Sequence, residues 1–221
     1  MLVHGAWHGA WCWERVTPHL DEAGIAWRAL DLPMRSLAGD AAAVRALLDE
    51  VDGSVVLVGH SYGGAVITAA GTHPAVEQLV FLAALTPDAG ESCVACYTEA
   101  GAPGTELGSA FRIDDGLATL DASAKPMLYN DCSDADADAA YARLRPISME
   151  CLTGSPAVVA WRERPSTYVV CADDLGVHPV LQRALGTRCG GDVVEWDVDH
   201  SPFYSDPART AKLCATLAEG A

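Results

Sequence analysis

One serine in the sequence has the surroundings of a catalytic nucleophile. Ser61 is the centre of a Gly-x-Ser-x-Gly motif that follows four apolar residues, 55–58, and precedes an apolar segment compatible with a helix. A serine on such a sharp strand-to-helix turn lies in a strained backbone conformation, with its hydroxyl above the edge of the sheet. The pattern predicts a nucleophile elbow, and the alternative is a serine that only caps the helix.

A serine hydroxyl is a poor nucleophile at neutral pH and needs a base that accepts its proton. Histidine suits this task because its ordinary pKa lies near neutrality. Among the seven histidines, His200 lies just past the last predicted strand, whereas His4 and His8 flank an N-terminal turn and His60 lies inside the elbow. We therefore predict that His200 is the general base.

The imidazole in turn needs a carboxylate that holds the correct tautomer. Asp173 and Asp174 follow one predicted strand, and Asp88 follows the strand before it. Asp199 is adjacent to His200 and cannot readily fold back onto its ring. The residues favour Asp174 as the acid, with Asp88 and Asp173 left as alternatives.

The negative charge that develops on a substrate carbonyl oxygen needs preset N–H donors. A glycine-rich turn, residues 4–11, follows a short strand at the N-terminus and leaves backbone N–H groups exposed. The residue after the nucleophile supplies a second backbone N–H in such sites. We expect the oxyanion hole to consist of the backbone N–H groups of Ala6 and Tyr62.

Strand and helix patterns alternate along most of the chain. The predicted strands are 2–3, 26–32, 55–58, 76–85, 167–171 and 193–197, and the predicted helices are 11–24, 40–51, 65–70, 134–144, 179–185 and 207–217. This alternation predicts an α/β fold with a doubly wound, mostly parallel sheet that is buried on both faces. Residues 86–165 have a looser pattern, but the stretch is too long to be a plain loop.

Composition limits the classes of partner. The chain of 221 residues can form one domain with a sizeable core, and its net charge of −16 disfavours nucleic acid and anionic membranes. The start of the chain has no basic leader, which predicts a cytoplasmic protein with eight reduced cysteines. Neither the Cys93-x-x-Cys96 pair nor the aspartates at 131–138 complete a metal site. We expect no metal and no cofactor.

With these residues in place, the chain resembles the α/β-hydrolase superfamily over nearly its whole length, including the chain order Ser61, Asp174, His200. More narrowly, it resembles the plant methylesterase and hydroxynitrile lyase family and its bacterial esterase relatives. The matching stretches are 2–11, 59–64, 80–84 and 168–174.

This resemblance implies the α/β-hydrolase fold and assigns Asp174 as the triad acid. It also implies a small, mobile helical cap at 86–165, inserted after the strand at about 79–85, with 1–85 and 166–221 forming the hydrolase core. The lyase branch would have a lysine just after the catalytic histidine and a threonine or asparagine near the N-terminal turn. Here Ser201 follows His200, and Gly5-Ala6 forms the turn. Esterase chemistry is therefore favoured over cyanide chemistry.

The expected function is a serine esterase that acts on a small, largely apolar ester, with no nucleic acid or membrane partner; a homodimer is left open. The alternatives are acyl transfer or cyclisation on the same triad, a hydroxynitrile lyase, and a non-catalytic binder of small molecules on the same fold. The predicted substrate lining consists of aromatic and apolar residues: Trp7, Tyr97, Phe111, Met127, Tyr129 and Trp161, with Leu128 as a further candidate.

Overall fold

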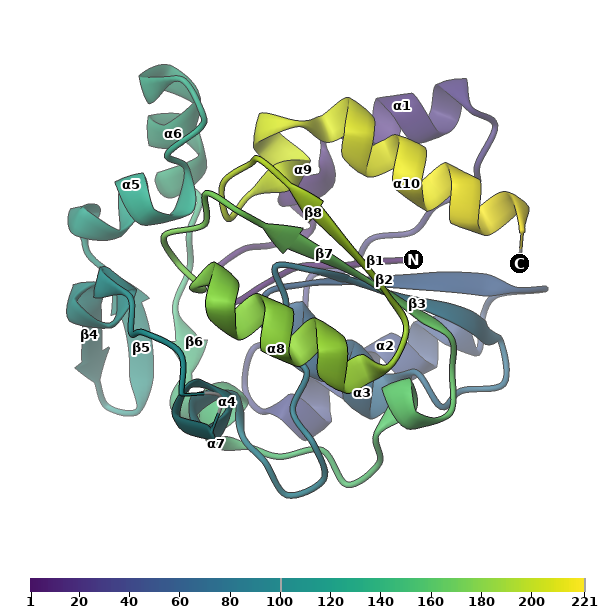
Figure 1. The fold of residues 1–221 in the computed structure, drawn as a ribbon, viewed down its shortest axis with the longest axis horizontal. Coiled ribbons are helices and arrows are strands. Elements are labelled where there is room, and N and C mark those ends of the chain that lie inside the picture. Colours follow the sequence, from purple (N-terminus) through teal and green to yellow (C-terminus); the bar gives the residue numbers. More distant parts are fainter. Residues whose placement is uncertain (100, 221) are drawn as a thin grey trace.

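A computed structural model describes residues 1–99 and 101–220 of the chain. Within them, the central sheet is five-stranded and fully parallel, with the strand order β1-β2-β3-β7-β8 (Figure 1). The prediction of a parallel α/β sheet is confirmed. The strands are β1 (Leu2–Val3), β2 (Val55–His60), β3 (Val76–Leu82), β7 (Ser166–Cys171) and β8 (Asp192–Trp196).

Helices cover both faces of this sheet, as Figure 1 shows, which confirms the doubly wound arrangement. One face packs against α2 (Leu37–Leu48), α3 (Tyr62–Ala70) and α8 (Pro179–Cys189). The other face packs against the 3-10 turn at Ala10–Trp13, α1 (Thr17–Glu22), α9 (Pro202–Ser205) and α10 (Pro207–Glu219). None of the described helices is long and apolar enough to cross a membrane.

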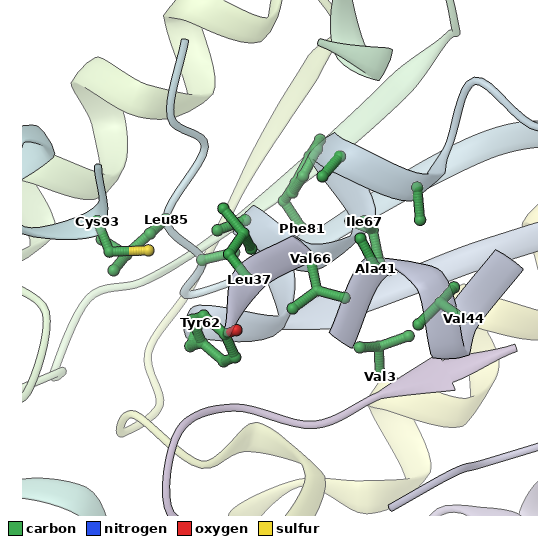
Figure 2. Close-up of a cluster of buried hydrophobic side chains, with 14 of the residues drawn as sticks. Val3, Leu37, Ala41, Val44, Tyr62, Val66, Ile67, Phe81, Leu85 and Cys93 are labelled. Atoms are coloured by element: carbon green, nitrogen blue, oxygen red, sulfur yellow. The ribbon is translucent and has the colours of Figure 1, made fainter. Parts of the chain in front are cut away.

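The larger hydrophobic core lies between the sheet and its α2–α3 face (Figure 2). Val44 of α2, Ile67 of α3 and Phe81 of β3 are fully buried there. Every residue of β2 is also buried, as expected for a central parallel strand that is covered on both faces. Each such side chain contributes roughly 1.5–3 kcal/mol through burial, so the turn between β2 and α3 is held by packed elements on both sides.

Three expectations about the core need correction. The predicted strand 26–32 is reduced to a single bridge between Leu2 and Ala29, because β1 offers only two residues for pairing. The predicted helix 11–24 is divided into the 3-10 turn and α1. Burial on both faces fails at the sheet edge, since four of the five β8 residues are exposed.

Most of residues 86–165, here called the cap, lies beyond the carboxyl ends of the parallel strands (Figure 1). Its last residues run back along α3, where Arg164 donates to the carbonyl oxygens of Thr72 and His73. The cap contains helices, as predicted, but it also contains a three-stranded antiparallel sheet in the order β4-β5-β6. Its strands and helices are α4 (Cys93–Glu99), β4 (Phe111–Asp114), β5 (Leu117–Leu120), α5 (Lys125–Leu128), α6 (Asp134–Tyr141), β6 (Ile147–Ser148) and α7 (Met149–Thr153), with 3-10 turns at Glu106–Ala110, Ala122–Ala124 and Ala160–Arg162. The exact bounds of core and cap remain a prediction.

Candidate active site

Ser61 lies on the turn between β2 and α3 with φ 50° and ψ −120°, a region that residues with a side chain rarely adopt. The turn is tightly packed. A Cβ built on Gly59 would lie 2.6 Å from the carbonyl oxygen of Gly63, and one built on Gly63 would lie 2.6 Å from that of Val3. Both flanking positions of the motif therefore require glycine. Among the described residues of α3, none donates a capping hydrogen bond to the Ser61 side chain, so the alternative of a capping serine is wrong.

The side chains of His200 and Asp174 form a buried hydrogen-bonded pair, 3% and 0% exposed, with 2.7 Å between Nδ1 and Oδ2. Because an ionised carboxylate only accepts hydrogen bonds, the proton lies on Nδ1 and the lone pair on Nε2. A general base needs this tautomer. The alternative acids lie elsewhere: Asp88 pairs with Arg162, and Asp173 is exposed. Of these three aspartates, the structure brings Asp174 to His200.

His60, directly before Ser61, connects the elbow to the loop that carries His200. Its Nε2 donates to the carbonyl oxygen of His200 over 2.8 Å, and the centroids of the two rings are 4.7 Å apart. Within the described part of the chain, the Ser61 hydroxyl has no direct hydrogen bond to His200. Such contacts are often long in a free enzyme and tighten when substrate binds. The missing bond is therefore compatible with the predicted roles of Ser61 and His200.

The loop after β1 passes next to the Ser61 side chain. A Cβ built on Gly5 would lie 2.7 Å from Nδ1 of His60 and 3.0 Å from Cβ of Ser61, so this approach requires glycine. Ala6 and Tyr62 line the same cavity as Ser61. Tyr62 is also the first residue of α3, where backbone N–H groups have no acceptor within the helix. This geometry is compatible with the predicted oxyanion donors.

Two buried histidines hold the carbonyl oxygens of this loop. His4 donates from Nδ1 to the carbonyl oxygen of Gly5 over 2.8 Å, and its Nε2 accepts a backbone N–H from a neighbouring loop over 3.0 Å. His8 donates from Nδ1 to Ala6 over 2.8 Å and accepts from the hydroxyl of Tyr129 over 2.8 Å. Tyr129, predicted to line the substrate site, therefore orients His8.

Burial keeps the histidines around the elbow neutral. Loss of hydration lowers the pKa of His4 to about 4 and that of His8 to about 3. The same cause, followed by the nearby His200, lowers the pKa of His60 well below its ordinary value. These three rings therefore act as fixed hydrogen-bonding groups at neutral pH and add no charge to the site. The sequence pattern placed them near the elbow but did not indicate this role.

Ser61 opens into a cavity of about 320 Å³ between the core and the cap. Trp7, Tyr97 and Phe111 line it, as the sequence analysis expected. The described lining carries no acidic or basic side chain. Several lining residues were not anticipated because they are apolar residues with no distinctive neighbours in the sequence: Leu85, Cys93, Val94, Leu107, Leu152 and Val177.

The other predicted lining residues lie elsewhere. Met127 lines an open, more polar cavity of about 970 Å³ on the far side of Thr105. Thr105 borders both cavities and donates from its hydroxyl to the carbonyl oxygen of Gly176 over 2.9 Å. The buried indole of Trp161 donates to the carbonyl oxygen of Pro87 over 3.4 Å.

Tyr62 lines the cavity, and its hydroxyl points into a buried polar cluster. The hydroxyl donates to Oδ2 of Asp40 over 2.6 Å, and Oδ1 of Asp40 accepts the backbone N–H of Met34 over 2.8 Å. The thiol of Cys151, in the cap helix α7, lies 3.6 Å from Oδ2 of Asp40. Burial raises the pKa of both the Asp40 carboxyl and the Tyr62 hydroxyl. The cluster fixes Tyr62 from its side-chain end.

The cap is also bonded to the loops that carry Asp174 and His200. Asp199, next to His200, accepts the backbone N–H of Asp131 over 3.1 Å, so its carboxylate faces the cap and not the imidazole. The amide of Asn130 donates to the carbonyl oxygen of Asp173 over 3.1 Å. These contacts join the cap to the loops on either side of the candidate site.

Comparison with known proteins identifies the family of this chain. The profile of the alpha/beta hydrolase family matches residues 1–213. A protein named salicylic acid-binding protein 2, from Nicotiana tabacum, is 30% identical over an alignment of 257 positions, which covers 99% of this chain and 95% of that protein. Methylesterase 9 from Arabidopsis thaliana is 29% identical over an alignment of 247 positions, which covers 98% of this chain and 95% of that protein.

Solved structures show the same fold. A pyrethroid hydrolase from Sphingobium faniae JZ-2 superposes with a TM-score of 0.86 at 24% sequence identity, covering 99% of this chain and 96% of that one. At this level of identity the likeness concerns the fold alone. The family match covers nearly the whole chain, and the chain therefore belongs to the alpha/beta hydrolase family.

Proposed function

We propose that this enzyme is a serine esterase that cleaves a small, largely apolar carboxylic ester through an acyl-enzyme intermediate. The observation that carries the proposal is the Ser61 elbow, which opens into an apolar cavity beside the buried His200–Asp174 pair. The names of the relatives support it, since one is a methylesterase and one structural neighbour is a pyrethroid hydrolase.

In the acylation step, the Ser61 hydroxyl attacks the ester carbonyl carbon while Nε2 of His200 accepts its proton. Asp174 stabilises the imidazolium through Nδ1. The negative charge moves onto the carbonyl oxygen, where the backbone N–H groups of Ala6 and Tyr62 donate to it. The intermediate then collapses, and His200 returns the proton to the departing alcohol.

In the deacylation step, water replaces the alcohol. His200 accepts a proton from the water as it attacks the acyl carbon, and the same two N–H groups stabilise the second intermediate. Collapse releases the carboxylic acid and restores the Ser61 hydroxyl. The apolar wall favours an uncharged ester over the ionised product acid, because a carboxylate would lose hydration without gaining a counterion in the cavity.

Hydrolysis of p-nitrophenyl butyrate by the wild type and the Ser61→Ala variant tests the proposal. Loss of the nucleophile should reduce kcat by about 10⁵-fold or more, as in other serine hydrolases. A fluorophosphonate probe should label the wild type at Ser61 and leave Ser61→Ala unlabelled. A folded wild type that neither hydrolyses a panel of acyl and aryl esters nor reacts with the probe would contradict the proposal. Analysis of products from a hydroxy-ester separates hydrolysis from cyclisation.

A further inference from the structure

Behind the His200–Asp174 pair lies a buried amide that the esterase mechanism does not use. Gln182 is on α8, eight residues after Asp174, and is fully buried. Its Nε2 donates to Oδ2 of Asp174 over 2.7 Å and to the carbonyl oxygen of Val177 over 2.7 Å. Its Oε1 accepts the backbone N–H of Cys171 over 2.9 Å. The side chain thus bridges the end of β7, the acid loop and the acid itself.

The partners of Gln182 allow one orientation of its amide. Cys171 offers an N–H, so the group that faces it must be the oxygen. Asp174 and Val177 offer oxygens that accept, so the group that faces them must be the nitrogen. A flipped amide would place an oxygen against two acceptors and a nitrogen against a donor. This network therefore settles the amide orientation.

The oxygen of Asp174 that receives the Gln182 hydrogen bond is the same one that receives Nδ1 of His200. The other oxygen, Oδ1, accepts the backbone N–H groups of Gly176 over 2.7 Å and of Val177 over 2.8 Å. The carboxylate is thus surrounded by neutral N–H donors on three sides and by the imidazole on the fourth. Neutral donors favour the ionised carboxylate without adding a cation that would compete with an imidazolium.

We propose that Gln182 is a positioning residue of the reaction: it fixes Oδ2 of Asp174 against Nδ1 of His200 and sets how strongly that carboxylate stabilises the protonated imidazole. The proposal builds on the esterase function proposed above. Because Oδ2 accepts hydrogen bonds from both the amide and the imidazole, the amide weakens the attraction between this oxygen and the imidazolium. It also prevents rotation of the carboxyl group, which would break the bond to the imidazole.

A glutamine side chain supplies both the hydrogen-bond donor and the acceptor that this position needs. Methionine at 182 would match the length of the side chain but would offer neither the donor for Asp174 nor an equivalent acceptor for Cys171. Glutamate would keep the shape but would place a second carboxyl oxygen against Oδ2, where two carboxylates must share a proton to coexist. These two substitutions therefore separate the chemistry of the amide from its volume.

The test compares Gln182→Met, Gln182→Glu and a matched control, Leu185→Met. Leu185 is also fully buried on α8, and its side chain has no polar atom that could bond to Asp174. With p-nitrophenyl butyrate, we expect kcat of Gln182→Met to fall by about 10–100-fold, with little change in KM. Losses of this size are typical when a group that hydrogen-bonds to a directly acting residue is removed. The acid limb of the Gln182→Met kcat/KM profile should move to higher pH, since Asp174 then stabilises protonated His200 more strongly. Gln182→Glu should also move the limb away from its wild-type position, because a proton shared between two carboxyls replaces the amide donor. Leu185→Met should leave the limb in place.

A second readout needs no substrate and so distinguishes this proposal from the esterase proposal. The Nδ1 proton of His200 should give a far-downfield proton NMR resonance in the free enzyme, identified by its disappearance in Asp174→Asn. Gln182→Met and Gln182→Glu should shift that resonance, and Leu185→Met should not. A resonance and pH profile in both Gln182 variants that match Leu185→Met would overturn the positioning role. If Gln182→Met does not fold, the near-isosteric Gln182→Glu alone shows whether the resonance and the pH profile change.

Discussion

Arg145 of the cap donates from Nε to the carbonyl oxygen of His8, in the loop that follows β1, over 2.9 Å. Its backbone N–H donates to Trp7 over 2.8 Å, and Nη2 donates to Leu32 over 3.0 Å. The indole of Trp7 donates in the opposite direction, to the carbonyl oxygen of Ala118 in β5, over 3.1 Å. The loop that carries a predicted oxyanion donor is thus held between core and cap.

This relationship predicts that Arg145→Lys lowers catalysis more than stability. Lysine has a single ammonium group in place of the guanidinium fork, so it cannot hold His8 and Leu32 in the same geometry. We expect kcat for p-nitrophenyl butyrate to fall by about tenfold, because a shift of the loop misplaces an oxyanion donor. Steady-state kinetics and urea unfolding measure the two effects.

Arg143→Lys is the matched control for that substitution. Arg143 is two residues away in the same cap segment, and its guanidinium pairs with Glu14 over 2.7 Å at a half-exposed site. Exposed pairs of this kind contribute little, so kcat should stay close to the wild-type value. Equal losses of kcat in the two variants would show that the cap contact does not position the loop.

The catalytic candidates could be located from the sequence because each directly follows a strand of a parallel sheet. Ser61 and His200 come after apolar runs whose length and composition identify buried or edge strands, and local pattern was sufficient there. The hairpin of the cap was missed because β4 and β5 have only four residues each and most of these residues are exposed. Its turn did carry a signal: Asp115 and Gly116 both have positive φ, 44° and 75°, as a two-residue type I′ turn requires.

The substrate lining was harder to predict because cap aromatics of similar type have different partners. Tyr97 and Phe111 border the cavity, whereas the hydroxyl of Tyr129 reaches His8, 121 positions earlier in the chain. Nothing near Tyr129 in the sequence encodes that contact. The amide of Gln182 is a similar case, since its role depends on how α8 packs against the end of β7.

Stability should fall in mild acid because three histidines are buried in neutral form. Burial lowers the pKa of His4 to about 4, that of His8 to about 3 and that of His60 well below its ordinary value. As the pH falls below 6.5, the unfolded chain binds protons on these rings while the folded protein does not, so unfolding becomes easier. From pH 7.5 to 5.5 each ring should cost about 1.4 kcal/mol of unfolding free energy.

Urea unfolding at both pH values measures this loss, and His8→Gln isolates one histidine. Glutamine does not titrate, so the variant should lose about 1.4 kcal/mol less than the wild type over the same interval. The carboxyls of Asp40 and Asp199, whose pKa values burial raises, act in the opposite direction, but they are common to both proteins. Identical pH dependence in the two proteins would mean that His8 binds the same number of protons in the folded and the unfolded state over this interval.

Gly5→Ala should remove activity while leaving the chain folded. The added methyl group would lie 2.7 Å from Nδ1 of His60 and 3.0 Å from Cβ of Ser61, so the loop must move away from the nucleophile. Displacement of one oxyanion donor typically costs about 100-fold or more in kcat. Kinetics and circular dichroism check the two parts of the prediction. Gly220→Ala, where the nearest contact of the new methyl group is 3.8 Å away, is the control. Near-normal kcat in Gly5→Ala would place the oxyanion site elsewhere.

The size of the cavity should set the length of acyl chain that the enzyme accepts. Leu107 lines the apolar cavity of about 320 Å³ and is largely buried. In Leu107→Trp the larger ring would occupy part of that volume. We expect kcat/KM for p-nitrophenyl octanoate to fall by about tenfold or more relative to the acetate ester, since one or two methylene groups in an apolar pocket are worth about that much.

Leu117→Trp controls for the general effect of a bulky residue in the cap. Leu117 is on β5 with 48% of its surface exposed and does not belong to the described lining of the cavity. The ratio of octanoate to acetate activity in Leu117→Trp should match that of the wild type. If Leu107→Trp also keeps that ratio, the acyl chain does not occupy this cavity, and the alcohol part of the ester is the portion that it holds. A parallel series of acetate esters with alcohols of increasing length would then show the discrimination that the acyl series lacked.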